Sequence, residues 1–258
     1  MTRPDDQTVS TSEMVDIRQE ADRILRAASA YGRFPTPVDD IIAAAKLKVE
    51  KEASLDVGYL ARMYKSVSGT IKHAVDKVWG LFHSGDKLIY LDLSVAKAKQ
   101  RFVSLHETGH GFLSWQKDLY ALLEDGDSAL DPDVEEDFER QANVFASEVL
   151  FQLDGFGTEA RSCAFTIKTP MDLAKRYGAS NYAAIRRYVS KSQYACAVLV
   201  LEPPVWEVGR GHTYRLRRCV PSSSFSTRYG SIHWPGLVAG CFRLLPICQP
   251  RSRALTIQ

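Results

Sequence analysis

Two histidines and a glutamate near the middle of the chain have a spacing that could support metal chemistry. His106, Glu107 and His110 form an HExxH motif. Side chains four positions apart lie on the same face of an α-helix, so His106 and His110 can occupy two coordination positions of one Zn²⁺. Glu107 lies beside this pair, where its carboxylate can take a proton from a water molecule and later deliver it to a leaving amine. The motif therefore predicts a catalytic zinc site with one ion per chain.

A catalytic zinc ion needs a third protein ligand and an open position for water. Four acidic residues that follow the motif are candidates: Glu135, Glu136, Asp137 and Glu139. Carboxylates also favour a helix N-terminus because they oppose the helix dipole. This effect explains the presence of Glu135 and Glu136 without a metal ion. Glu139 lies a turn further in, so we predict it as the third ligand. Asn143, four residues later on the same face, is predicted to hydrogen-bond the outer nitrogen of a ligand histidine.

The two motif segments are predicted to lie on helices that follow a β-hairpin. Strand-like residues 78–82 and 87–93 flank a turn. Residues 95–115 have helical periodicity and carry the HExxH motif, and residues 134–151 form a second periodic helix that carries Glu139. The apolar positions of these helices are Phe102, Leu105, Phe112 and Leu113 in the first, and Phe138, Ala142, Phe145, Ala146, Val149 and Leu150 in the second. These faces are expected to hold the ligands against a core.

The elements outside the motif are expected to be mostly helical. Ser10 and Glu13 form a capping box that begins a helix, and Thr36 is predicted to cap a second helix with Pro37 at its first position. The buried stripe of the first helix is predicted to be Ile17, Ala21, Ile24, Leu25 and Ala28. Further expected elements are a strand at 47–49, a weak helix within 54–75, an acidic loop at 120–132, helices at 173–177 and 182–189, and a strand at 196–201. The fold class is therefore α+β, mainly helical with a small β-sheet.

Charge is distributed unevenly along the 258 residues. The formal net charge is +2, but residues 208–258 contain eight arginines and no Lys, Asp or Glu, which leaves about −6 on residues 1–207. An apolar fraction of 45% excludes a disordered chain and a collagen-like fibre. The basic C-terminal part is weakly periodic. It is interpreted as an irregular extension, as a stretch translated out of frame, or as a segment whose charge attracts nucleic acid.

Several bulk features predict a cytoplasmic protein. No run approaches the roughly 20 apolar residues of a membrane-spanning helix, and the N-terminal residues lack an apolar signal core. The five cysteines are odd in number and form no CxxC pair, which favours reduced thiols over a disulfide framework. We therefore expect no membrane association.

The two helical motifs together resemble the ImmA/IrrE metallopeptidases. Residues 101–110 (RFVSLHETGH) and 139–150 (ERQANVFASEVL) are similar to that family's RF-x₃-HE-x-GH and E-x-x-AN-x-FA-x-E-x-L patterns. The resemblance extends over about residues 15–200. One departure lies at residues 149–152, which read VLFQ where the family usually has Leu-Leu-Met-Pro.

The resemblance implies a zincin-like metallopeptidase core with His106, His110 and Glu139 as zinc ligands and Glu107 as the catalytic base. The expected domains are an N-terminal helical segment at 1–50 that packs on the core, a zincin-like metallopeptidase domain at 51–200, and a basic, poorly patterned tail at 201–258. Members of the family typically cleave a helix-turn-helix repressor, which releases transcription of stress-response or mobile-element genes. The expected partner is therefore such a repressor, as the protein substrate.

Two alternatives are not excluded by the sequence. The helix pair at 173–189 carries Lys175, Arg176, Arg186 and Arg187 and could contact DNA phosphate, although such pairs more often pack on the core with a solvated basic face. The chain could also be a non-proteolytic regulator that binds a repressor or DNA with a structural zinc ion, or a member of a toxin–antitoxin-like module. The sequence predicts neither the oligomeric state nor the residue that stabilises the oxyanion.

Overall fold

The computed structural model describes residues 9–50, 80–83, 87–124, 131–209, 211–230, 237–238 and 254–257. The chain divides into two compact units. The first contains Met1–Phe156 and Lys175–Ser180, and the second contains Gly157–Ala174 and Asn181–Gln258. All predicted metal ligands belong to the first unit.

The first helix begins at the predicted capping box. Helix α1 is Thr11–Ala27, and the Ser10 hydroxyl accepts from the Glu13 backbone N–H while the Glu13 carboxylate accepts from the Ser10 backbone N–H. These two bonds satisfy donors that the first helical turn leaves without partners. The predicted stripe Ile17, Ala21, Ile24, Leu25 and Ala28 is buried, which confirms the orientation of the helix.

The predicted cap of the second helix is wrong. Helix α2 is Val38–Ala44, its N-cap is Pro37, and no side chain caps it. The Thr36 hydroxyl is buried and instead donates to the backbone oxygen of Leu150, 2.7 Å away. That oxygen lies in the last turn of another helix, whose terminal carbonyl groups need donors. Thr36 therefore stabilises a tertiary contact.

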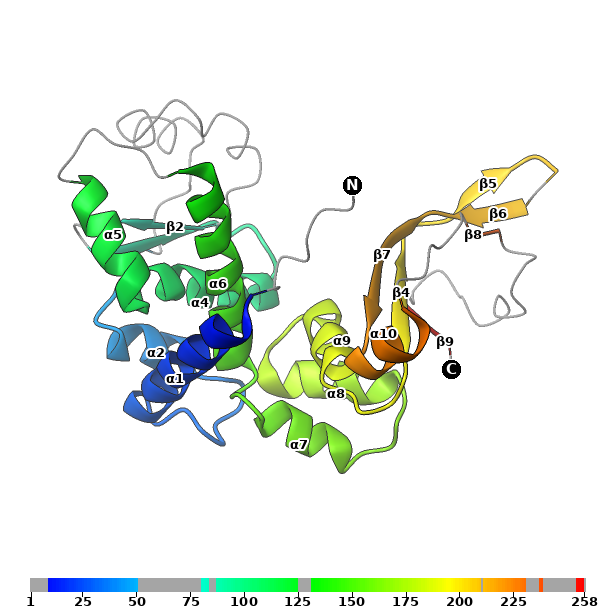
Figure 1. Ribbon diagram of the computed structural model, residues 1–258, viewed down its shortest axis with the longest axis horizontal. Coiled ribbons are helices and arrows are strands. Elements are labelled where there is room, and N and C mark those ends of the chain that lie inside the picture. Colours follow the sequence, from blue (N-terminus) through cyan, green and yellow to red (C-terminus); the bar gives the residue numbers. More distant parts are fainter. Residues whose placement is uncertain are drawn as a thin grey trace. The chain divides into compact units, whose positions relative to one another are not determined.

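A three-stranded sheet precedes the HExxH helix. Its strands are β1 (Lys48–Glu50), β2 (Gly80–His83) and β3 (Leu88–Leu91), in the order β1-β3-β2. β1 pairs with β3 in parallel, and β2 pairs with β3 as the predicted antiparallel hairpin. Among the described strands, β2 lies at the edge of this sheet, and both hairpin strands pack against the HExxH helix (Figure 1).

The HExxH helix ends earlier than predicted. Helix α4 is Lys97–Phe112, because Leu113 adopts an extended conformation, and helix α5 begins at Ser114 and continues to Glu124. The predicted acidic loop at 120–132 is therefore helical in its first residues, since α5 has its own apolar positions. Residues 125–130 lie outside the described residues.

The glutamate helix packs against the HExxH helix. Helix α6 is Pro132–Leu150, with Asp131 as N-cap and Pro132 in the first turn. All six apolar positions predicted for this helix are buried. α6 packs on α4 and on α1 (Figure 1), so one helix brings the N-terminal helix and the HExxH helix together.

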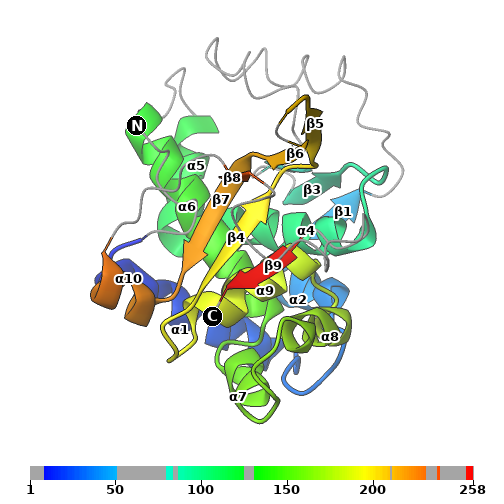
Figure 2. The ribbon, with the colours of Figure 1, turned by 90° about the vertical axis from the view of Figure 1, so that its right-hand side faces the viewer.

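The second unit combines short helices with antiparallel strands. Its helices are α7 (Gly155–Arg161), α8 (Lys168–Tyr177), α9 (Asn181–Ser190) and α10 (Ser223–Tyr229), and both α7 and α8 extend into the first unit. Its strands are β4 (Ala197–Leu201), β5 (Val205–Glu207), β6 (Gly211–Tyr214), β7 (Leu216–Pro221), β8 (Leu237–Val238) and β9 (Ala254–Ile257). One sheet has the order β7-β4-β9 (Figure 2) and the other β5-β6-β8. The core of the unit includes Val189, Val198 and Val220. β4, α8 and α9 confirm predicted elements, whereas α7 and the strands after residue 204 are not predicted by the sequence pattern.

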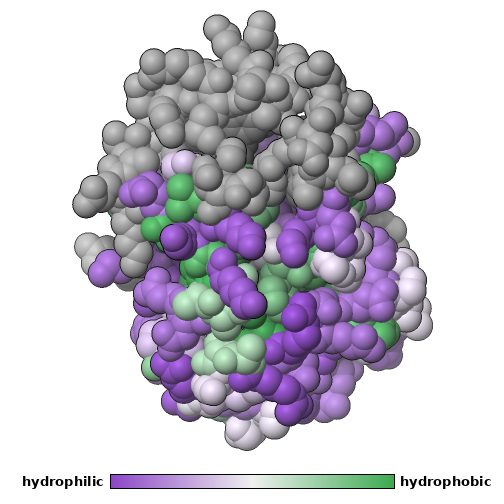
Figure 3. All heavy atoms as spheres, turned by 90° about the vertical axis from the view of Figure 1, so that its left-hand side faces the viewer, coloured by the Kyte–Doolittle hydropathy of each residue, from purple (hydrophilic) through white to green (hydrophobic). Residues whose placement is uncertain are grey.

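Figure 3 shows the face that lies on the left of Figure 1, where hydrophilic residues cover most of the described surface around a smaller apolar area. Among the described residues, no helix is both long enough and apolar enough to cross a membrane. The helix predicted within residues 54–75 lies outside the described residues.

Candidate metal centre

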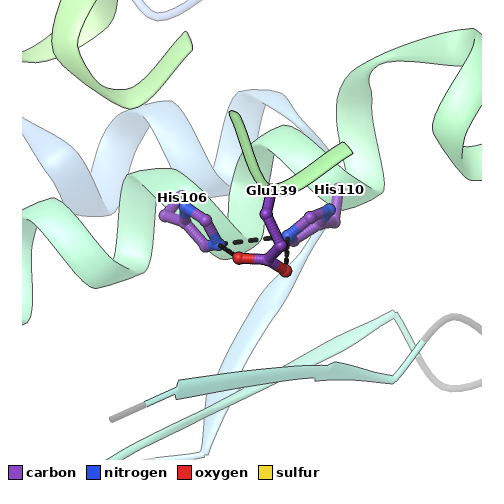
Figure 4. Close-up of side chains that lie close together, drawn as sticks. All are labelled: His106, His110 and Glu139. Atoms are coloured by element: carbon purple, nitrogen blue, oxygen red, sulfur yellow. Dashed lines mark hydrogen bonds and ion pairs between the residues drawn. The ribbon is translucent and has the colours of Figure 1, made fainter. Parts of the chain in front are cut away.

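The two histidines of the HExxH motif and Glu139 converge on one point (Figure 4). His106 and His110 project from α4, and Glu139 projects from α6. The Nε2 atoms of the two histidines are 3.1 Å apart. The Glu139 carboxylate oxygens lie 3.2 Å from His106 Nε2 and 3.4 Å from His110 Nε2. The structure thus brings together the three residues predicted as metal ligands.

This donor set suits a metal ion. Ligand atoms arranged tetrahedrally around Zn²⁺ at about 2.0 Å are roughly 3.3 Å apart, which is close to the separations found here. Two imidazole lone pairs and a carboxylate oxygen repel one another at such distances unless a cation lies among them. The arrangement therefore fits a zinc ion. In the metal-free protein, a proton on an imidazole can reduce the same repulsion.

Each histidine is oriented by an amide on its outer nitrogen. His106 Nδ1 lies 3.1 Å from Asn143 Oδ1, the contact that the sequence predicted. His110 Nδ1 lies 2.8 Å from Oε1 of Gln116, which is fully buried. Gln116 is not predicted by the sequence pattern, because nothing in that pattern indicates that α5 begins directly after α4. Both imidazoles can thus donate from Nδ1 and keep Nε2 for a metal ion.

Glu107 lies next to the three ligands and is 8% exposed. Burial raises the pKa of Glu107, while the charges of His106 and His110 and a hydrogen bond from the Phe82 backbone N–H act in the opposite direction. Phe82 belongs to the edge strand β2. A carboxyl group whose pKa is raised by burial holds a proton more readily, as an acid–base catalyst requires.

Glu139 is the most exposed of the three residues predicted as ligands. Its side chain is 53% exposed, compared with 13% for His106 and 6% for His110. Burial disfavours the charged imidazolium of His106, but the hydrogen bond and charge of Glu139 outweigh it and raise the pKa of His106 to about 9. Burial also opposes ionisation of Glu139, but the hydrogen bonds of both histidines hold its pKa well below the usual range.

The other predicted acidic candidates do not reach the site. Glu135, Glu136 and Asp137 are exposed near the start of α6. Glu136 and Asp137 form ion pairs with Arg140 one turn further along the same helix. These carboxylates therefore stabilise the start of α6 and its surface. This agrees with the alternative interpretation given for Glu135 and Glu136, in which carboxylates oppose the helix dipole.

The mainly helical fold, the HExxH helix and the added glutamate define a zincin-like metallopeptidase core. The family model described as the IrrE N-terminal-like domain, a peptidase family, matches residues 37–188, more than half of the chain. The chain therefore belongs to the ImmA/IrrE metallopeptidase family. No curated protein matches the chain.

Proposed function

We propose that this chain is a zinc-dependent intracellular endopeptidase that cleaves a helix-turn-helix transcriptional repressor and so releases transcription of stress-response or mobile-element genes. The observation that carries the proposal is the convergence of His106, His110 and Glu139 with Glu107 beside them. Membership of the family supports the peptidase activity. The repressor substrate is supported by the resemblance of the motifs alone.

Glu107 performs the proton transfers of the proposed reaction. A bound zinc ion would supply a Lewis acid that lowers the pKa of a water molecule to about 7 and polarises the scissile carbonyl group. Glu107 accepts the proton of the attacking water and delivers it to the amine nitrogen as the carbon–nitrogen bond breaks. Asn143 and Gln116 keep the two imidazoles in place, and the Glu139 side chain is half-exposed.

Glu107→Gln separates metal binding from catalysis. The amide cannot accept the proton, so we expect peptide cleavage to fall by at least about 100-fold while zinc is still bound. Cleavage of a purified helix-turn-helix repressor and the zinc content of the same preparation are the two measurements. Glu202→Gln is the matched control because this exposed carboxylate belongs to the second compact unit, whereas the site belongs to the first, and it should leave both unchanged.

Two results would argue against the proposal. Full cleavage by the Glu107→Gln variant would contradict the role of the base. A wild-type protein that binds zinc and cleaves no repressor would favour the regulator with a structural zinc ion.

A further inference from the structure

A line of hydrogen bonds leads from His110 to the N-terminal helix. Gln116 Oε1 lies 2.8 Å from His110 Nδ1, and Gln116 Nε2 lies 2.8 Å from Gln141 Oε1. Gln141 Nε2 in turn lies 2.7 Å from Oε1 of Glu13, which is 128 positions earlier in the sequence. The line joins α5, α6 and α1 in series, and both glutamine side chains are buried.

The direction of the line is fixed by two groups that have only one hydrogen-bonding role each. The backbone oxygen of Phe138 can only accept, and it lies 3.2 Å from Gln116 Nε2. The indole nitrogen of Trp115 can only donate, and it lies 2.8 Å from Gln141 Oε1. Each amide is therefore oriented by a contact outside the line. Gln116 must present its oxygen to His110, and Gln141 must present its nitrogen to Glu13.

This polarity determines which nitrogen of His110 carries the proton. Because Gln116 Oε1 can only accept, His110 donates from Nδ1, and its Nε2 keeps a lone pair for a metal ion. Every donor in the line then points away from the metal centre, and the last acceptor is the Glu13 carboxylate. Glu13 is also fixed by the Ser10 backbone N–H, 2.7 Å from its Oε2.

His106 is held differently. Its Nδ1 contacts the Asn143 amide directly, and Asn143 lies on the same helix as Glu139. The outer nitrogen of His110 is therefore held through the start of α5 and, by way of Gln141, the start of α1. Among the described residues, the outer nitrogen of His106 is held from α6.

We infer that Gln116, Gln141 and Glu13 are positioning residues that hold His110 in the Nδ1-protonated form required of a metal ligand, and that they couple helix α1 to the metal centre. A carboxylate commonly orients a metal-bound histidine by direct contact. Here the Gln116 and Gln141 amides lie between the imidazole and the Glu13 carboxylate, and each amide passes on the same donor-to-acceptor direction. The inference rests on the proposed function in that it takes zinc as the ligand of the site.

The test compares zinc dissociation constants, measured by competition with a chromophoric chelator, for Gln116→Leu, Glu13→Ala and two matched controls. Gln116→Leu removes the acceptor of His110 and should weaken zinc binding by about 10- to 100-fold. Glu13→Ala removes only the end of the line and should weaken it less, by about threefold or more.

The controls separate the relay from helix stability. Ser10→Ala removes the other half of the capping box and leaves the Glu13–Gln141 contact in place. Gln100→Leu removes a glutamine of α4 whose amide donates to the backbone oxygens of Leu93 and Val95. Both controls should bind zinc as the wild type does. Glu13→Ala keeps the test decisive if Gln116→Leu does not fold, because Glu13 lies near the surface.

A second readout follows the proton itself. Long-range ¹H–¹⁵N spectra of the zinc-loaded protein should place the proton of His110 on Nδ1, and Glu13→Ala should speed its exchange with water. Zinc affinities equal to those of the controls, or a proton on Nε2, would overturn the inference. A wild-type protein that binds no zinc would instead overturn the proposed function.

Discussion

At His106, a proton and a metal ion compete for the same nitrogen. The pKa of His106 is raised to about 9 because its interaction with Glu139 outweighs the cost of burial. The raised pKa means that protonation stabilises the folded metal-free protein fully below 6.5, the ordinary pKa of a histidine, and that this contribution is lost as the pH rises through about 9. Zinc binding has the opposite dependence on pH, because the metal needs the deprotonated imidazole.

We therefore predict that zinc binding at pH 7 releases about one proton from His106 and that zinc affinity rises between pH 6 and about 9. Titration calorimetry in buffers with different ionisation enthalpies measures the number of protons released. Glu139→Gln should reduce this number, since the pKa of His106 is raised mainly by the Glu139 carboxylate. Affinity that does not change between pH 6 and 9 would contradict this account.

The convergence of the residues predicted as ligands follows from their spacing on two helices. His106 and His110 share a face at four residues apart, and Glu139 and Asn143 repeat this spacing on α6. Gln116 was not predictable in the same way. Its role arises from the break at Leu113 and from tertiary contacts with α6, and neither has a periodic signal in the sequence.

At the scale of the elements, Gly109 allows α4 to approach α6 closely. A Cβ added to Gly109 would lie 3.2 Å from the Phe145 ring and 3.4 Å from Ala142 Cα. Gly109 immediately precedes His110, so the distance between these helices also determines how the histidines meet Glu139.

We predict that Gly109→Val lowers the free energy of unfolding by about 1–3 kcal/mol and weakens zinc binding, because the larger side chain pushes the helices apart. Denaturant unfolding and zinc competition measure the two effects. Gly157→Val is the control, since the atom nearest an added Cβ there is the flexible Arg161 guanidinium at 3.5 Å. Equal stability of the two variants would show that the helices do not depend on this contact.

The end of α6 explains the departure from the family pattern. Gln152 has a φ of 50°, and its backbone N–H donates to the Val149 oxygen. Its buried side chain accepts from the Gly32 N–H at 2.9 Å and donates to the Arg33 oxygen at 2.9 Å. Gln152 therefore fastens the segment between α1 and α2 to the end of α6.

Restoring the usual proline at position 152 is predicted to destabilise this chain. Gln152→Pro requires a negative φ and removes the backbone donor, so it should cost about 3 kcal/mol or more. Gln152→Gly tolerates the positive φ and loses only the side-chain bonds, and it should cost less, about 1–3 kcal/mol. The order of the two denaturation midpoints is the measurement, and a proline variant at least as stable as the glycine variant would refute the explanation.

At the scale of the whole molecule, the acidic and basic parts of the chain differed in how well their folds could be predicted. In the acidic part, amphipathic helices such as α1 and α6 were predicted because their apolar periodicity extends over several turns. The hairpin was predicted because a turn separates two strand-like runs. After residue 204, the described strands are short and include exposed arginines such as Arg217 and Arg218. Their pairing is non-local, since β7 and β9 both pair with β4, and it leaves little pattern in the sequence.

The burial of arginines in the helix pair α8 and α9, which suggested DNA binding, was also not predictable from the sequence pattern. Arg186 and Arg187 are buried in α9, although their charge favours an exposed position. Contact of this pair with DNA was the less favoured interpretation and stays untested, and the domain boundaries at residues 50 and 200 stay predictions.

We propose that one zinc ion binds between α4 and α6. Anomalous diffraction at the zinc absorption edge, from crystals of the protein purified without added chelator, measures where the ion lies. We predict a single peak per chain, about 2.0–2.2 Å from His106 Nε2, His110 Nε2 and a Glu139 carboxylate oxygen. A zinc-loaded protein whose peak lies at other residues, or that binds zinc equally well after His106→Ala, would contradict the account.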